Sequence, residues 1–247
     1  MEPTTAQILA AAERLRGHVV ATPLVGCRVQ DPDGEATEVR IKPEILQPGG
    51  TLLFRGLANH LLGGFRAYRG LILRGGAGIA LAALQLGAAR RCRLVLVPGS
   101  PLDADDAERL RSLGVEVVPV EASAEAAEAA VLRIQTERGF HPAPGVEDPE
   151  FCAGIATVGL ELGRDLPREA GPVIVAPAGC AAAVGLGLRA AGRKLTVLPA
   201  DPGATARLLD PLALGLGGLA WSSCGRAALA TALRASGADS RVVVLGA

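Results

Sequence analysis

Short apolar runs alternate with amphipathic stretches along most of the chain. Apolar runs bounded by turn residues predict buried strands, and apolar residues at helical spacing predict helices. The runs that predict strands are 39–41, 70–73, 92–97, 115–120, 172–175, 195–198 and 242–245. The stretches that predict helices are 6–16, 52–68, 79–86, 103–113, 124–138, 153–161, 181–192 and 225–236. Because mostly apolar strands alternate with helices, we expect an α/β fold with largely parallel sheets covered on both faces.

Two stretches depart from this alternation. Residues 25–37 are mostly polar, and Asp31-Pro32-Asp33-Gly34 within them predicts a turn. Between residues 201 and 223 the spacing of apolar residues becomes irregular. We therefore predict a turn in the first stretch and assign no regular element to the second.

The composition narrows the classes of protein that the chain can represent. Of its 247 residues 49% are apolar, enough for a core of its own. The formal net charge is zero, and no run of Lys and Arg supplies a phosphate-binding face, so we expect no nucleic-acid partner. No uninterrupted apolar stretch has the length of a membrane span, and the N-terminus lacks a signal-peptide pattern. We expect a cytoplasmic protein that does not contact a membrane.

Cysteine and histidine spacing predicts neither a metal site nor a disulfide framework. The five cysteines lie far apart and form no C-x-x-C pair. The three histidines show no metal-ligand spacing. We expect most of the cysteines to be small buried residues.

The most informative stretch is residues 41–56. Residues 42–47 run as a strand edge into Pro48, and Gly49-Gly50 frees the backbone. Thr51 is a suitable N-cap for the helix that follows. The pattern of this stretch by itself indicates a strand-loop-helix joint.

This stretch resembles the segment that carries the cofactor lysine in fold-type II pyridoxal-phosphate enzymes, the threonine/serine dehydratase and tryptophan synthase β group. The family pattern is roughly K-x-E-x-x-Q-P-T-G-S-F-K-x-R-G. Seven residues stand in register with it: Lys42, Glu44, Gln47, Pro48, Gly50, Arg55 and Gly56. Thr51 replaces the serine, and Leu53 occupies the position of the Schiff-base lysine.

Weaker matches extend the resemblance over most of the chain. Thr22-Pro23-Leu24 is similar to the family's opening, and residues 153–161 are similar to its A-G-x-G-T-x-x-x-E helix. The resemblance implies two domains with largely parallel sheets and a trimmed C-terminal part. The large domain would comprise 1–70 and 140–247, and the small domain 71–139.

The resemblance also implies a cofactor site whose chemical groups are changed here. Leu53 has no amine to form an imine. The phosphate loop falls on Gly179 and Cys180, followed by alanines that would crowd a phosphate. The substrate-carboxylate loop lacks its Ser, Asn and His and falls on Arg74, Gly75, Gly76, Ala77 and Gly78. The partner of the ring nitrogen would follow the last strand, where no such residue remains. From these changes we expect that pyridoxal phosphate is lost and that no cofactor is bound.

The lysines, Cys180 and the Gly76-x-Gly78 pair can also be interpreted without the cofactor site. The chain has only two lysines, Lys42 and Lys194, and we expect both on the surface. Cys180 at a helix N-terminus is a minority candidate for a nucleophile. The Gly76-x-Gly78 pair lacks the third glycine of a dinucleotide fingerprint, so tight helix–strand packing is the better interpretation.

Two hypotheses of different class follow. The first is a threonine/serine dehydratase-like pseudoenzyme with a structural or regulatory role, as a homodimer or paired with an active relative. The second is a repurposed enzyme or binding protein whose interdomain cleft accepts a small acid or anion. Its candidate contacts are Arg55, Arg74 and the Gly-rich turn at 75–78. A third, less favoured hypothesis is an active pyridoxal-phosphate-dependent ammonia-lyase with a relocated lysine.

Overall fold

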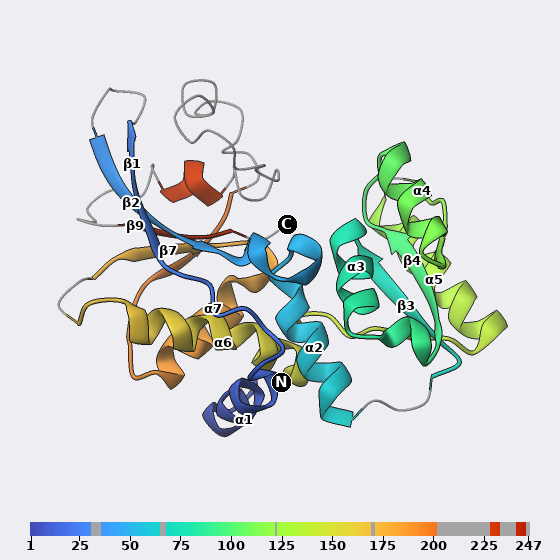
Figure 1. Cartoon of the computed structure of the whole chain (residues 1–247), viewed down its shortest axis with the longest axis horizontal. Helices are drawn as coiled ribbons and strands as arrows, with labels where there is room; N and C mark the ends of the chain where they lie inside the picture. Colours follow the sequence, from blue (N-terminus) through green and yellow to red (C-terminus); the bar gives the residue numbers. More distant parts are fainter. Residues whose placement is uncertain are drawn as a thin grey trace.

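The chain forms two sheets flanked by helices (Figure 1). The computed structural model describes residues 1–30, 36–64, 68–121, 123–168, 171–201, 228–232 and 241–245. The larger sheet has the strand order β1-β2-β9-β7-β8 and the smaller one the order β5-β4-β3-β6. The strands are β1 (Val25–Gln30), β2 (Ala36–Pro43), β3 (Gly70–Gly75), β4 (Arg93–Pro98), β5 (Val115–Val117), β6 (His141–Pro142), β7 (Val173–Ala176), β8 (Val197–Pro199) and β9 (Arg241–Leu245).

The helices begin and end close to their predicted positions. They are α1 (Thr5–Leu15), α2 (Leu53–Gly64), α3 (Ala77–Gln85), α4 (Ala104–Ser112), α5 (Ala124–Arg138), α6 (Pro149–Asp165) and α7 (Ala181–Ala190). Thr4 caps α1 with a full capping box, and Ser123 caps α5. Helix α6 starts four residues earlier than predicted, because Asp148 caps it and Pro149 suits its first position.

The smaller sheet is parallel throughout and buried on both faces. Along β3, Leu71 and Leu73 pack into the core shared with α2, α3 and α6, whereas Ile72 packs against α5 on the opposite face. Adjacent side chains of a strand point to opposite faces, so two covered faces require a continuous apolar run. This explains why the pattern of β3 and β4 is apolar rather than alternating.

The larger sheet is parallel except at β1, which pairs antiparallel with β2. Strand β1 was missed in the sequence because it lies at the edge of the sheet and has no continuous apolar run. The predicted turn at 31–34 and most of the irregular stretch 201–223 lie outside the described residues. Of the helix predicted at 225–236, residues 228–232 are described and are helical.

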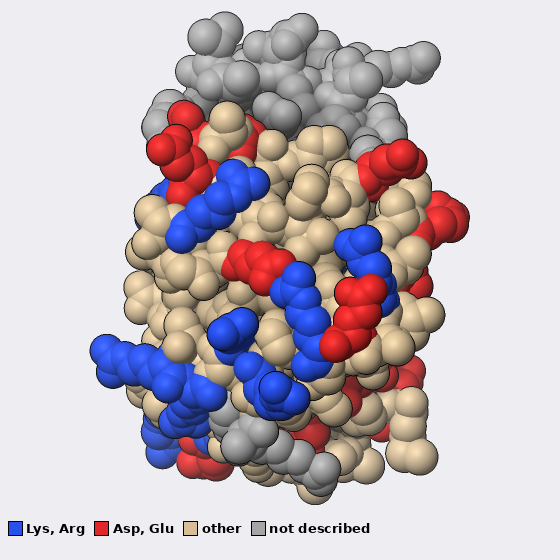
Figure 2. Space-filling model, turned by 90° about the vertical axis from the view of Figure 1, so that its right-hand side faces the viewer, with Lys and Arg blue, Asp and Glu red and all other residues tan. Residues whose placement is uncertain are grey.

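The division into domains at about 70 and 140 stays a prediction. Strand β6 at 141–142 pairs with β3 and therefore belongs to the smaller sheet. Figure 2 shows basic and acidic side chains interspersed on the face at the right of Figure 1. Within the ranges that the structure describes, no helix is long and apolar enough to cross a bilayer.

Candidate functional site

The residues retained from the family motif converge on a buried ionic cluster. Arg55 at the start of α2 lies between Glu44 and Glu161, with the side chains of Arg55 and Glu44 fully buried. Its Nε donates to Glu44 Oε2 at 2.7 Å, and its Nη1 donates to Glu161 Oε1 at 2.7 Å. Both carboxylates also accept a second hydrogen bond from Nη2. The guanidinium is thus held by two bidentate pairs.

The charge of Arg55 is stabilised in this environment. Burial by itself lowers the pKa of Arg55, but the two carboxylates outweigh burial through charge and hydrogen bonding, so that its pKa is raised. Thr157 Oγ1 accepts a further bond from Nη1 at 3.1 Å. Thr157 and Glu161 are the Thr and Glu of the A-G-x-G-T-x-x-x-E pattern at 153–161. This pattern and the motif at 41–56, far apart in sequence, therefore meet at one guanidinium.

Lys42 belongs to the same cluster. Its side chain is fully buried, with Nζ 2.6 Å from Glu161 Oε2 and 3.7 Å from Asp165 Oδ2. The ammonium also donates to the carbonyl of Thr22 at 2.6 Å. The prediction that Lys42 lies on the surface was wrong, because Glu161 and Asp165 on α6 compensate its charge inside the protein. Lys194 is exposed, as predicted.

The cluster also fastens the segment that leads from α1 to β1. Gln47 makes two hydrogen bonds with the backbone of Val20, one donated and one accepted. Thr22 Oγ1 donates to Glu44 Oε1 at 2.6 Å. The guanidinium of Arg55 donates to buried protein groups in this cluster. Arg55 therefore stabilises the packing of the fold and does not reach the cavity described next.

Leu53 lines a cavity of about 490 Å³ between α2 and α6 on one side and β3, α3 and α5 on the other. The side chain is half-buried, and the amide of Leu53 donates to Thr51 Oγ1 at 3.2 Å. Apolar wall is supplied by Leu57, Ile79, Val131, Val146 and Phe151. No lysine is among the described residues that line this cavity.

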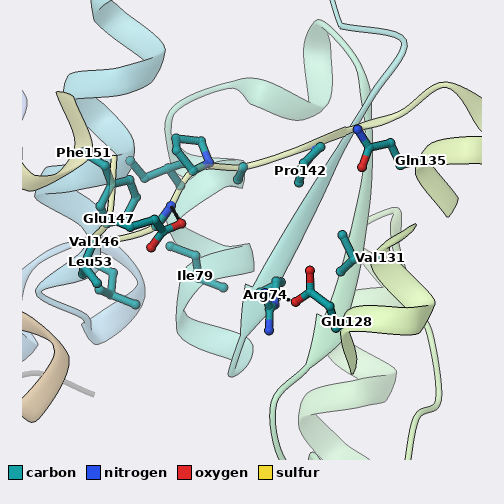
Figure 3. A pocket seen from close by; sticks show the side chains of 14 residues that line it. Leu53, Arg74, Ile79, Glu128, Val131, Gln135, Pro142, Val146, Glu147 and Phe151 are labelled. Carbon is teal, nitrogen blue, oxygen red and sulfur yellow. Dashed lines mark hydrogen bonds and ion pairs between the residues drawn. The ribbon is translucent and has the colours of Figure 1, made fainter. Parts of the chain in front are cut away.

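The charged and amide side chains of the cavity are Arg74, Glu128, Gln135 and Glu147. Arg74 Nη1 pairs with Glu128 Oε2 at 2.7 Å (Figure 3). Glu147 folds back so that its Oε1 accepts the amide of Gly145 at 3.2 Å. Among the described lining residues, one cation and two carboxylates therefore face this space, and the cation is already paired.

Of the predicted Gly-rich turn, Arg74 reaches the cavity, while Gly75, Gly76, Ala77 and Gly78 are not among its described lining residues. These residues lead from β3 into α3. A Cβ on Gly78 would lie 2.7 Å from the carbonyl oxygen of Gly49. A Cβ on Gly49 would meet the carbonyl oxygen of Gly78 and lie 2.9 Å from the amide nitrogen of Ala82. Gly78 and Gly49 thus allow α3 to pack closely against the 48–50 turn. The sequence had predicted close packing of this helix against a strand.

The predicted phosphate loop lies elsewhere. Gly179 and Cys180 form a 3-10 turn that precedes α7, with Gly179 exposed and Cys180 buried. Neither residue is among the described ones that line the cavity beside Leu53. The predicted ligand contacts therefore do not form one group: Arg74 stands at the cavity, Arg55 in the buried cluster, and Gly179 and Cys180 at α7.

Two largely parallel sheets flanked by helices, with a cavity between those helices, define an α/β protein. Sequence comparison defines its family. The sequence model of the family described as "Pyridoxal-phosphate dependent enzyme" matches residues 15–245. The chain belongs to this family. A relative from Sinorhizobium fredii described as "Putative threonine dehydratase" is 33% identical over 168 residues, which cover 65% of this chain. The match spans about half of that relative, 48% of its length.

Solved structures support the fold. Maize serine racemase superposes with a TM-score of 0.75 at 19% identity, covering 100% of this chain and 93% of that one. The threonine deaminase of T.th. gives a TM-score of 0.73 at 21% identity, covering 99% of this chain and 97% of the other. The fold is thus that of fold-type II enzymes, as the motif at 41–56 predicted.

These comparisons correct the prediction that the chain takes no cofactor. The family is one of pyridoxal-phosphate dependent enzymes, and among the similar structures is a pyridoxal 5'-phosphate-dependent aspartate racemase. The family therefore points to pyridoxal phosphate, and no described feature demonstrates that its binding is lost. The replacement at Leu53 concerns only the covalent link between protein and cofactor. Leu53 lines the cavity and has no amine, so the described residues do not fit an imine at this position.

Sequence reasoning missed Glu128 and Glu147 as cavity residues. Glu128 is one of several acids on the exposed side of α5, and Glu147 lies in the connection between β6 and α6. Neither belongs to a motif or shows a distinctive spacing. Their common position depends on how α5 packs beside β3, which the sequence pattern does not specify.

Proposed function

We propose that this chain is a threonine dehydratase-like protein that no longer performs the lysine-dependent chemistry of its family and serves a structural or regulatory role. The observation that supports the proposal is that the residues of the motif at 41–56 lie in two different places. Lys42, Glu44, Gln47 and Arg55 build the buried cluster, whereas the position that faces the cavity carries Leu53. Residues that hold the scaffold are retained, and the reactive amine is replaced.

Neither lysine is placed to substitute for that amine. The fully buried ammonium of Lys42 is bound by Glu161 and by the carbonyl of Thr22, and moving it would break both interactions and leave Glu161 with Arg55 alone. Lys194 is exposed and lines a surface pocket with Arg168 and Arg193. The proposal concerns the covalent link alone, and the cofactor is the one that the family indicates.

Borohydride trapping tests this proposal. The purified chain is incubated with pyridoxal phosphate, reduced with borohydride, digested and analysed by mass spectrometry. We expect no stoichiometric adduct on Lys42 or Lys194 and no ammonia release from serine or threonine. The Leu53→Lys variant is the matched control, because it returns an amine to the cavity, and Lys194→Met reports labelling at the surface. A stoichiometric adduct on Lys42 together with ammonia release would refute the proposal.

A regulatory role would be exercised through a partner, and we propose a homodimer or a complex with an active relative in the cytoplasm. A second candidate function is a binding protein that uses the cavity beside Leu53. Its volume of about 490 Å³ and mostly apolar wall support this candidate, since small-molecule sites have this character.

A further inference from the structure

We infer that the cavity beside Leu53 binds small organic ammonium ions, that is, a primary amine on a short apolar chain. The inference rests on the second candidate function, in which the cavity is a ligand site. The sequence suggested a small acid or anion as the ligand of this cleft. The ligand inferred here has the opposite charge.

The first argument is the charge of the wall. Arg74 is the one basic side chain among the described lining residues, and Glu128 already neutralises it at 2.7 Å. A small acid would have to displace Glu128 from Arg74 before it gained a cation. Arg55, the other predicted anion contact, is held by Glu44 and Glu161 outside the cavity.

The second argument is Glu147. Among the described residues its carboxylate accepts the amide of Gly145, and no basic side chain pairs with it. An ammonium has three donors and no acceptor, so it complements a carboxylate with remaining lone pairs. With Leu53 in place of a lysine, the wall has one positive charge fewer than the family motif would supply.

The third argument is the apolar surface around this carboxylate. In Figure 3, Leu53, Val146 and Phe151 lie toward the same side as Glu147, while Arg74 and Glu128 lie toward the other. Burial of each methylene against an apolar wall strengthens binding about fourfold. A ligand with a few methylenes and one ammonium can therefore cover the leucine while its head group meets Glu147.

Matched ligands of one size test the sign of the charge. We would titrate n-butylammonium, butyrate and 1-butanol at pH 7 and constant ionic strength and follow backbone amides by NMR. We expect butylammonium to shift amides of the cavity wall with a Kd about fivefold lower than that of butanol, the upper range for an exposed ion pair. Butyrate should bind more weakly than butanol.

Variants test the residues. Glu147→Gln should bring the Kd of butylammonium to that of butanol, whereas Arg74→Gln should lower it about threefold, because Glu128 is then unpaired. Glu108→Gln, an exposed change on α4, should leave it unaltered. Equal or tighter binding of butyrate, no binding of butylammonium, or an unchanged Kd in Glu147→Gln would overturn the inference. None of these results depends on lysine labelling, so failure here is distinguishable from failure of the pseudoenzyme proposal.

Discussion

Replacement of Arg55 by methionine should lower the free energy of unfolding by about 3–5 kcal/mol, the range for breaking a buried ion pair from one side. The methionine removes the guanidinium that binds Glu44 and Glu161 and leaves the fully buried Glu44 without a cation. The expected cost is therefore dominated by the uncompensated carboxylate and not by lost contact area. Urea denaturation would measure the change as a shift of the midpoint at constant slope.

The matched control is Arg16→Met. Arg16 forms an equally short pair with Glu13, at 2.6 Å, but both side chains are more than two thirds exposed. Removal of this pair should cost less than about 1 kcal/mol. A double variant separates charge from packing: Glu44→Gln should cost less in the Arg55→Met background than in the unchanged protein, because it removes the stranded charge. A loss for Arg55→Met as small as that for Arg16→Met would mean that water reaches the cluster.

Gly49→Ala should be the second strongly destabilising change. Gly49 has φ +78°, and a Cβ there would press on the backbone of α3 at Gly78 and Ala82, 2.9 Å from the amide nitrogen of Ala82. The left-handed backbone costs about 1–3 kcal/mol for a non-glycine residue. Displacement of the packed backbone adds about 1–3 kcal/mol. Thermal unfolding followed by circular dichroism would report the sum as a lowered Tm.

Gly50→Ala is the control for this prediction, since Gly50 has nearly the same φ of +70°. Its Cβ would find only the carbonyl oxygen of Ile45, at 3.9 Å, so this variant bears the backbone cost alone. The difference between the two variants measures the cost of the clash between the added methyl group and α3. Equal losses would show that a methyl group at residue 49 does not displace α3.

The sequence by itself determined most of the elements and the family. Apolar runs and helical spacing located β3, β4, β7 and the helices within a few residues, because these patterns record which side chains are buried along a local period. The motif at 41–56 identified the fold-type II family, which comparison confirmed. Its letters also identified Leu53 as the residue at the position of the reactive lysine.

Tertiary structure decided which of the motif residues reach the cavity. Arg55 and Lys42 are hydrophilic residues that the sequence pattern places at the surface or at a ligand. Each is buried because Glu161, 106 residues beyond Arg55, lies beside it on α6. Strand β1 was missed because it has no continuous apolar run. As an edge strand it is held by backbone hydrogen bonds to β2, which do not depend on an apolar sequence pattern.

The charge of the cavity also depends on the folded chain. The paired Arg74 and the open Glu147 owe their positions to the packing of α5 and to the β6–α6 connection. Sequence periodicity records burial over a few residues, whereas the charge of a cavity is the sum of side chains from segments that only the folded chain brings together.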